Sequence, residues 1–298
     1  MNILVIGAGG IGSFFGGMLS KNNNVFLLGR KKHVEKINKK GLKITGKTNL
    51  NIKIEAFSSI KDVFIIPDLV IIAVKSYDTE IAMKIAKEII RENTYVMSLQ
   101  NGLDNIEKIK KYVKPDRIIV CITTNGIVFS KPGTINHTGI GRTIIGSLNN
   151  KNSRFVKDIN SSLNACGVKT KINNDIIKEI WIKAIINSSI NPLTSIFNCK
   201  NGYLIKNPIL EKIVEKICTE STIIANTQGL KLSESDMINK TKQVINETSE
   251  NHSSMLQSIH LGKKTEIDSI NGKLIYIGKK HNVDTSLNEI LFHSIKFL

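Results

Sequence analysis

The chain begins with a short apolar run that leads directly into a glycine-rich turn, Met-Asn-Ile-Leu-Val-Ile-Gly-Ala-Gly-Gly-Ile-Gly. Residues Ile3 to Ile6 are continuously apolar, which is typical of a central parallel strand covered on both faces. The segment 13–19 predicts a helix, and Val25 to Leu28 predicts a second strand at the distance that a βαβ unit requires. The first 28 residues therefore constrain the N-terminal part to a strand–helix–strand unit around Gly-x-Gly-x-x-Gly.

The glycines of this turn have separate roles in a dinucleotide site. Gly7 allows the tight turn, Gly9 lets a pyrophosphate approach the backbone, and Gly12 lets the helix pack close to the strand. The N–H groups at the start of the helix then face the phosphates. We predict that the dinucleotide binds to the turn formed by Gly7, Ala8, Gly9, Gly10, Ile11 and Gly12.

The end of the second predicted strand indicates which dinucleotide is bound. An NAD site usually carries Asp or Glu here, to accept a hydrogen bond from the ribose 2′-OH. This chain instead reads Leu28-Gly29-Arg30-Lys31-Lys32, with three cations where a 2′-phosphate would lie. Because Arg30 can bind a phosphate with its planar guanidinium group, we predict NADP. The alternative is a solvated basic turn in a Lys-rich chain.

The pattern of the first half predicts a doubly wound α/β domain over residues 1–173. Apolar runs typical of buried strands alternate with helical patterns (strands over 68–74, 94–99 and 117–122; helices over 77–91 and 103–111). Residues 125–146 are expected to form short antiparallel strands at a sheet edge. A helix over 152–165 and a strand over 167–171 complete this Rossmann-type domain.

From Asn174 onward the sequence has helical periodicity. Asn174 is a suitable N-cap for the first of six predicted helices (175–191, 207–227, 234–247, 252–261, 265–279 and 285–297). Residues 174–298 are therefore predicted to form a mainly α-helical second domain. Because no low-complexity linker separates the two parts, we expect the domains to pack with a cleft between them.

Composition excludes several classes of protein. The chain has 298 residues, of which 41% are hydrophobic, and a formal charge of +17. The sequence contains no stretch of ~18 uninterrupted apolar residues, so no membrane span is predicted. No Lys or Arg precedes the apolar N-terminus, which argues against a signal peptide. Lys residues are scattered and no nucleic-acid motif is present, so the positive charge predicts attraction of an anionic cofactor and substrate rather than nucleic-acid binding.

The cysteines predict reduced thiols and no metal site. Cys121, Cys166, Cys199 and Cys218 are far apart, and neither a Cys-x-x-Cys motif nor a pair of His at ligand spacing occurs. Free thiols are typical of a reducing compartment, so we expect a cytoplasmic protein.

A polar series on the first predicted helix of the second domain is the first candidate for chemistry. Lys183, Asn187 and Asn191 are four residues apart, which places them on one helical face within an arc of about 80°. Isoleucines fill the remaining faces, and Pro192 is expected to kink or end the helix. One interpretation is a face directed at a ligand, because buried amides and ammonium groups are costly without partners. The other is an exposed polar stripe.

Two further segments are candidates. Glu266 is expected in the first turn of a helix, where a carboxylate also suits the helix dipole without any catalytic role. Ser253 and Ser254 precede another helix and are also suitable N-caps. Asn101 follows a buried strand, at the carboxyl end where doubly wound folds bind ligands.

Together these motifs resemble the ketopantoate reductase (2-dehydropantoate 2-reductase) family over nearly the whole chain. The resemblance depends on the following segments: the N-terminal Gly-x-Gly-x-x-Gly, Ala73-Val-Lys75, Gln100-Asn101-Gly102-Leu103, Thr123-Thr124, Lys183-x-x-x-Asn187-x-x-x-Asn191-Pro192-Leu193-Thr194, Ser253-Ser254-Met-Leu-Gln257 and Thr265-Glu266-Ile-Asp-x-Ile-Asn271-Gly272. The chain departs from the family pattern in having no Arg before Thr265 and in Asn125-Gly126.

The resemblance implies an oxidoreductase that uses NADPH to reduce ketopantoate to (R)-pantoate in pantothenate and coenzyme A biosynthesis. It implies that Lys183 is the general acid and that Glu266 lies at the nicotinamide and substrate end, where it helps to position Lys183. The other implied contacts are Asn187, Asn191, Asn201 and Ser254 for the substrate, and Arg30, Lys75, Asn101 and the neighbourhood of Ile127 for the cofactor.

Two alternatives stay open at this point. One is a related reductase of another branched 2-oxo acid, with Lys183 and Glu266 kept and the substrate contacts changed. The other is a non-catalytic NADP-binding sensor, which would have little reason to keep both residues. The sequence does not distinguish a monomer from a homodimer.

Overall fold

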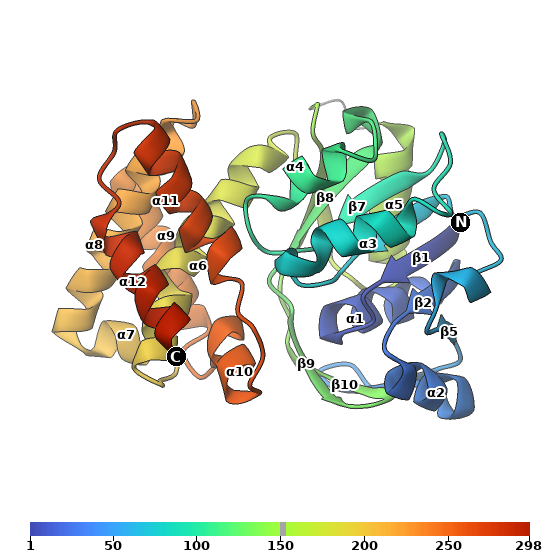
Figure 1. The fold of residues 1–298 in the computed structure, drawn as a ribbon. Coiled ribbons are helices and arrows are strands. Elements are labelled where there is room, and N and C mark those ends of the chain that lie inside the picture. The colour runs from blue at the N-terminus through green and yellow to red at the C-terminus, as the bar shows by residue number, and fades with distance from the viewer. Residues whose placement is uncertain (150–152) are drawn as a thin grey trace. The chain divides into compact units, whose positions relative to one another are not determined.

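The computed structural model describes residues 1–149 and 153–298, and within them the chain forms two compact units (Figure 1). The first unit comprises residues 1–100 and 105–176. The second comprises residues 101–104 and 177–298. The short segment 101–104 thus belongs to the C-terminal unit, although it lies in the first half of the sequence.

The first unit is built on an eight-stranded sheet with the order β12-β11-β8-β7-β6-β1-β2-β5. Neighbouring strands are parallel except β8 and β11, which are antiparallel. The strands are β1 (Asn2–Ile6), β2 (Asn24–Leu28), β5 (Glu55–Phe57), β6 (Leu69–Ile72), β7 (Tyr95–Ser98), β8 (Ile118–Thr123), β11 (Thr143–Ser147) and β12 (Thr170–Ile172).

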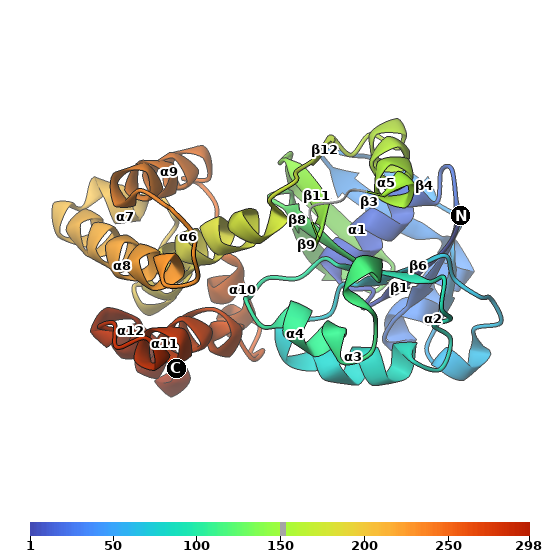
Figure 2. The same ribbon diagram turned by 90° about the horizontal axis from the view of Figure 1, so that it is seen from above.

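Both faces of this sheet are covered, which explains the continuous apolar runs. Successive side chains of a strand point to opposite faces. Ile3 and Val5 pack with α1 (Gly10–Leu19) and α5 (Arg154–Ala165), whereas Leu4 and Ile6 pack with α3 (Thr79–Ala86) and α4 (Asn105–Lys110). Figure 2 shows the two pairs of helices on opposite sides of the sheet. The predicted Rossmann-type, doubly wound architecture is confirmed. The helix predicted over 152–165 is α5, and position 152 lies outside the described residues.

A second, four-stranded sheet covers α1. Its order is β4-β3-β10-β9, from Leu50–Ile52, Leu42–Gly46, Thr134–Gly139 and Gly126–Lys131. Residues 125–146 were expected to form short antiparallel strands at a sheet edge, and β9 and β10 are such an antiparallel pair, with β9 at the edge of this second sheet. Strand β10 pairs with β3 in this separate sheet, and β11 lies inside the main sheet between β8 and β12. The apolar side chains of Leu42, Ile44 and Ile135 join the core on the α1 side, so the second sheet buries its inner face there.

The second unit is helical, as predicted. Its helices are α6 (Ile176–Ile196), α7 (Tyr203–Lys206), α8 (Pro208–Asn226), α9 (Glu234–Glu247), α10 (Ser254–His260), α11 (Asn271–Lys280) and α12 (Ser286–Phe297). Helix α6 is buried on most sides, because Ala184, Ile185 and Ile186 are all buried although successive helical residues point to different faces. It continues through Pro192 to Ile196, so the proline does not end it.

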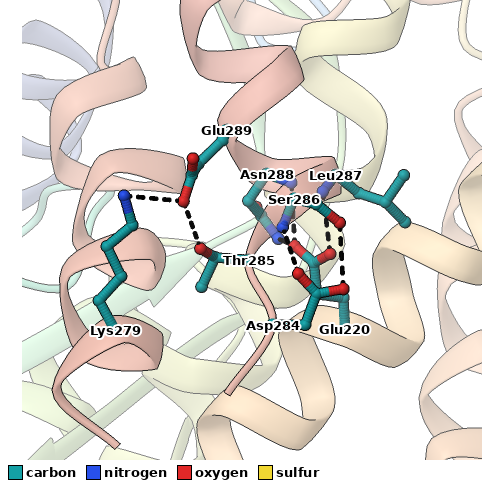
Figure 3. Close-up of polar contacts among 8 residues, drawn as sticks. All are labelled: Glu220, Lys279, Asp284, Thr285, Ser286, Leu287, Asn288 and Glu289. Atoms are coloured by element: carbon teal, nitrogen blue, oxygen red, sulfur yellow. Dashed lines mark hydrogen bonds and ion pairs between the residues drawn. The ribbon is translucent and has the colours of Figure 1, made fainter. Parts of the chain in front are cut away.

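A buried carboxylate holds α8 against the start of α12 (Figure 3). Glu220 accepts hydrogen bonds from the backbone N–H groups of Leu287 and Asn288, both at 2.9 Å, and from the Asn288 amide at 2.7 Å. These N–H groups belong to the first turn of α12, where a negative charge also suits the helix dipole. Glu220 therefore satisfies N–H groups of a helix whose N-cap residue, Thr285, makes no side-chain capping bond.

Candidate active site

The glycine-rich turn has the backbone conformation that its sequence predicts. Gly7 has φ +103°, and a Cβ there would lie 2.7 Å from the backbone N of Val74. A Cβ at Gly12 would collide with the carbonyl oxygen of Gly7, so the helix starts in direct contact with the strand end. At Gly9, in contrast, a Cβ would meet nothing within 4 Å, and the residue is exposed. Space for a ligand is therefore present at the central glycine, while the outer two are needed for packing.

The start of α1 fits a phosphate. Its N-cap is Gly9, which provides no side-chain cap, and its first turn contains no acidic residue. Backbone N–H groups and the positive end of the helix dipole face outward at such a terminus, and both favour an anion. Ile127 of β9 lies beside it, because its carbonyl oxygen is 3.3 Å from a Cβ built at Gly10. This places Ile127 at the border of the predicted cofactor site.

The basic turn after β2 borders the glycine-rich turn. The N–H groups of Gly7 and Ala8 both donate to the carbonyl of Leu28, at 3.0 and 3.1 Å. A Cβ at Gly29 would lie 2.7 Å from that of Ala8, so the two turns are in van der Waals contact. Arg30 follows as the exposed N-cap of α2 (Lys31–Lys40), and Lys31 and Lys32 are exposed in its first turn. Three cations therefore lie beside the proposed phosphate turn.

His33 connects these elements, and sequence analysis did not identify it. It is 3% exposed and contacts three parts of the first unit. Its Nδ1 accepts from the Gly133 N–H at 2.9 Å, its Nε2 lies 3.1 Å from Ser13 Oγ of α1, and its ring packs on Phe129. Because Nδ1 accepts, the proton is on Nε2, which donates to Ser13. Burial lowers the pKa of His33, in agreement with a neutral ring. His33 could not be identified from the sequence, because it lies in no motif or periodic pattern that indicates these contacts.

Lys75 lies on the loop after β6, where doubly wound folds bind ligands. It is the half-buried N-cap of a short 3₁₀ turn, Ser76–Asp78. The side-chain amide of Gln100 donates to the carbonyl of Val74 at 2.9 Å, and Lys108 Nζ donates to the carbonyl of Ser76 at 3.0 Å. Both carbonyls that flank Lys75 are thus held by side chains, so its backbone is fixed.

In the helical unit, the polar series on α6 is not a solvated stripe. Lys183 and Asn187 are half-buried, and Asn191 is only 6% exposed. The interpretation of the series as an exposed surface stripe is therefore wrong, because α6 is the covered central helix of this unit. Polar groups in such a position need partners or a ligand.

Pro192 links α6 to the segment that contains Glu266. A proline has no N–H, so the carbonyl four residues earlier, that of Ser188, loses its helical donor. The side-chain amide of Asn271 donates to this carbonyl at 3.3 Å and also to Asn288 Oδ1 at 2.9 Å. Asn271 thus takes the place of the missing donor, which lets the helix continue past Pro192. This hydrogen bond joins the motif that begins at Lys183 to the motif that begins at Thr265.

Glu266 is buried, at 7% exposure, and lies directly before a short 3₁₀ turn, Ile267–Ser269. The expectation that it falls in the first turn of a helix over 265–279 is wrong, because the backbone breaks at Ile270 (φ −106°, ψ −89°) and α11 begins only at Asn271. Its carboxylate Oε2 lies 3.5 Å from the side-chain amide nitrogen of Asn101. The N–H of Leu103 also donates to the carbonyl of Ser269 at 2.9 Å. This second hydrogen bond holds segment 101–104 against the segment that contains Glu266. Glu266 therefore does not lie in the first turn of α11, where the helix-dipole interpretation would place it.

Asn201 and Ser254 lie on neighbouring segments. The backbone N–H of Asn201 donates to the carbonyl of Asn251 at 2.9 Å. Ser253 is the N-cap of α10, since its Oγ accepts from the Leu256 N–H at 3.2 Å and from the Thr194 hydroxyl at 2.8 Å. Ser254, the exposed next residue, does not perform this capping role.

The structure thus collects the predicted residues into two groups. In the first unit, the glycine-rich turn, Arg30 and Ile127 border one another. In the helical unit, Lys183, Asn187 and Asn191 share α6, and Asn101 meets Glu266. Asn271, which donates to the carbonyl of Ser188 on α6, was not assigned a role from the sequence.

Comparison with known proteins identifies two matching family descriptions. "Ketopantoate reductase PanE/ApbA" matches residues 3–150, and "Ketopantoate reductase PanE/ApbA C terminal" matches residues 175–298. Among curated relatives, the 2-dehydropantoate 2-reductase of Pyrococcus horikoshii is 42% identical over 99% of this chain and 97% of its own length. That of Archaeoglobus fulgidus is 31% identical, over 99% and 96%.

Solved structures of the same architecture include one with bound ligands. D-Mandelate dehydrogenase with NADH and anilino(oxo)acetate has a TM-score of 0.93 at 26% identity, over 99% of this chain and 97% of that chain. The PanE/ApbA family ketopantoate reductase from Ralstonia eutropha has a TM-score of 0.91 at 25% identity, over 100% and 98%.

Proposed function

Because this chain belongs to the ketopantoate reductase family, we propose that it reduces the C2 ketone of ketopantoate to the alcohol of (R)-pantoate, with NADPH as cofactor. The resemblance found in the sequence is confirmed by these matches. The proposed place of the reaction is the synthesis of pantothenate and coenzyme A, as the name of the relatives implies.

The chemistry requires few groups from the protein. The nicotinamide supplies a hydride to C2, and the ketone oxygen then carries the negative charge of an alkoxide. A nearby ammonium group stabilises that charge and donates the proton that completes the alcohol. We assign this role to Lys183, which lies half-buried on the central helix of the second unit.

Glu266 and the asparagines are assigned to binding and positioning. Glu266 is buried and oriented toward Asn101, and its segment is tied to α6 by the hydrogen bond from Asn271 to Ser188. We propose that Asn187, Asn191, Asn201 and Ser254 contact the substrate. The single observation that carries the proposal is this link between the two elements that contain Lys183 and Glu266.

The first unit would hold the dinucleotide. The proposed contacts are the turn at residues 7–12 for the pyrophosphate, Arg30 for the 2′-phosphate, and Lys75, Asn101 and Ile127 along the rest of the cofactor. The exposed Gly9, the uncapped start of α1 and the absence of a carboxylate at the end of β2 support this proposal. We propose that residues 1–173 form the cofactor domain and that residues 174–298 supply the substrate and catalytic groups.

Steady-state oxidation of NADPH, followed at 340 nm with ketopantoate as substrate, tests the proposal. NADH is measured in parallel. Turnover with ketopantoate and a lower KM for NADPH than for NADH are expected. An enzyme that oxidises NADPH with other 2-oxo acids but not with ketopantoate would contradict the substrate assignment and leave the reaction class intact.

A second candidate is the reduction of another branched or aromatic 2-oxo acid. It is favoured by the similarity to D-mandelate dehydrogenase, whose structure contains NADH and an oxoacetate. A panel of 2-oxo acids in the same assay separates the two candidates, because the better substrate has the higher kcat/KM.

We also propose a cytoplasmic location and a monomer or homodimer that acts on a small molecule rather than on nucleic acid. Within the described residues the four cysteines form no disulfide, as expected in a reducing compartment. Among the helices of the described ranges, none has the length and apolarity of a membrane span.

A further inference from the structure

The two ring nitrogens of His33 bind to two different elements of the first unit. His33 lies in the first turn of α2 and is buried. Its Nε2 lies 3.1 Å from Oγ of Ser13, a fully buried residue of α1, and its Nδ1 accepts from the N–H of Gly133, in the turn between β9 and β10. One side chain therefore connects the start of α2 both to α1 and to the β9–β10 hairpin.

The β9–β10 hairpin contacts both helices whose N-termini border the proposed cofactor site. At its turn, the carbonyl of Gly133 accepts from the N–H of Lys43 on β3 at 2.9 Å, and a Cβ on Gly133 would lie 2.6 Å from Cγ of Lys36 on α2. At the start of β9, Ile127 borders Gly10 of α1. The hairpin is thus held at both ends, and His33 supplies the hydrogen bond between its turn and α2.

The backbone of Arg30 belongs to the same turn of α2 that the His33 ring fixes. Its carbonyl accepts from the N–H groups of His33 and Val34, at 2.9 and 3.1 Å, while its side chain is exposed. NADPH would place its pyrophosphate at the start of α1 and its 2′-phosphate at Arg30. Two contacts to one ligand reach their full strength only when the protein already holds both binding elements at the right distance. The link between α1 and α2 therefore bears on the 2′-phosphate contact.

We propose that His33 is a positioning residue that, through its hydrogen bond with Ser13, holds Arg30 at a fixed place relative to the glycine-rich turn. This inference rests on the function proposed above. NADH has no 2′-phosphate, so its affinity does not depend on where Arg30 lies. His33 therefore increases the discrimination between the two cofactors, although its ring is covered and contacts neither of them.

The two hydrogen bonds of the ring can be removed separately. His33→Asn keeps an acceptor for the Gly133 N–H but is too short to reach Ser13, whereas the longer amide of His33→Gln reaches the position of Nε2 and loses the acceptor for Gly133. Ser13→Ala removes the same link from the side of α1. Thr94→Val is the matched control, because Thr94 is also buried in the first unit and its hydroxyl donates to the carbonyl of Pro67 at 2.8 Å, at the amino end of β7.

Fluorescence titration of the whole chain, without substrate, measures the Kd of NADPH and of NADH for each variant, and urea denaturation checks that each variant is folded. We expect Ser13→Ala and His33→Asn to raise the Kd for NADPH by about three- to tenfold, since one neutral hydrogen bond is lost. The Kd for NADH should stay within about twofold of its value in Thr94→Val, and His33→Gln should bind NADPH within about twofold of wild type. In an Arg30→Ala background, Ser13→Ala should no longer change the ratio of the two Kd values, because the contact that it positions is gone.

Other outcomes separate this inference from the proposed function. Equal rises of both Kd values in Ser13→Ala and His33→Asn, or an unchanged Kd for NADPH, would overturn the positioning role of His33 while the proposed function stands. The same holds if Ser13→Ala still lowers the preference for NADPH in the Arg30→Ala background. A wild-type protein that binds NADH as tightly as NADPH would overturn the proposed cofactor and the role of His33 together.

Discussion

The side-chain amide of Asn101 donates to Oε2 of Glu266 across 3.5 Å, although 165 residues separate them in the sequence. Asn101 follows β7 in the sequence but belongs to the second unit, as does Glu266, which precedes α11. Glu266 is buried, so a neighbouring amide donor helps to hold its carboxylate in one orientation. The proposed catalytic group Glu266 is thus positioned by a residue that the resemblance assigns to the cofactor.

Removal of the proposed general acid should abolish most of the turnover. We expect Lys183→Ala to lower kcat by roughly 10²–10⁴-fold, with NADPH affinity nearly unchanged. Glu266→Ala should also lower kcat/KM, and the double variant should be little worse than the poorer single variant, because the two groups act as a unit. Steady-state kinetics measures all three, with Lys216→Ala as a control on an exposed lysine of α8. A Lys183→Ala enzyme within about tenfold of wild type would contradict the assignment.

The preference for NADPH should depend on Arg30. Loss of one charge-assisted contact weakens binding by about 1.5–3 kcal/mol, or roughly 10- to 150-fold. We expect Arg30→Ala to raise the Kd for NADPH by this factor and to leave the Kd for NADH nearly unchanged. Lys40→Ala, at the other end of α2, is the control for a general loss of positive charge. Equal affinity of the wild-type protein for both cofactors would refute the role of Arg30.

Pro192 and Asn271 should be coupled in their effect on the free energy of unfolding. Asn271→Ala leaves the Ser188 carbonyl without its donor and should cost about 1–3 kcal/mol. In Pro192→Ala the backbone N–H returns and can satisfy the same carbonyl, so Asn271→Ala should cost less in that background. Urea denaturation of the two single variants and the double variant measures the coupling. Strict additivity would show that the Ser188 carbonyl does not connect the two residues.

Stability should fall as the pH is lowered below the usual pKa of histidine. Burial lowers the pKa of His33 and of His137, so folding favours the neutral form of both rings. A lowered folded-state pKa gives a contribution that is fully present above the unfolded value of about 6.5. This contribution is lost as the pH falls from about 6.5 toward the lowered pKa, because the unfolded chain binds protons first.

The histidine contribution can be isolated with His33→Asn, which removes the titrating group and keeps an acceptor for the Gly133 N–H. The free energy of unfolding, measured by denaturation at pH 7.5 and pH 5.5, should fall less between these pH values in the variant than in the wild type. An identical fall in both proteins would assign the acid sensitivity to other groups.

The N-terminal part should bind cofactor by itself. We expect a fragment of residues 1–172 to bind NADPH weakly and to have no reductase activity, because it lacks Lys183 and Glu266. Fluorescence titration measures binding, and the 340 nm assay measures turnover. A fragment that turns over ketopantoate would contradict the proposed division of roles.

Some of this structure could be predicted because local signals agree with the tertiary environment. The β1–α1–β2 unit has an apolar strand and glycines whose positions demand glycine, and helix α9 has the predicted bounds of 234–247. Strands β3 and β4 were not predicted, because they are only five and three residues long. A strand that depends on a distant partner, as β3 depends on β10, has little signal of its own.

The site was predictable only where its residues repeat at a helical spacing or match a known motif. Lys183, Asn187 and Asn191 share a face by their spacing, but their burial follows from the packing of other helices. Pro192 was expected to kink or end α6, and local propensity could not reveal that Asn271, 79 positions later, supplies the missing donor. His33 acts through tertiary hydrogen bonds, which have no sequence period.

The assignment of residues 101–104 to the helical unit has a consequence for recombination between related genes. The Leu103 side chain packs with the core of that unit, so the unit is built from two separate stretches of the gene. Recombination at a single point near residue 176 would exchange Glu266 while leaving Asn101 behind. Chimaeras between distant relatives should therefore lose activity unless both stretches come from the same parent, and the two halves are expected to be inherited together.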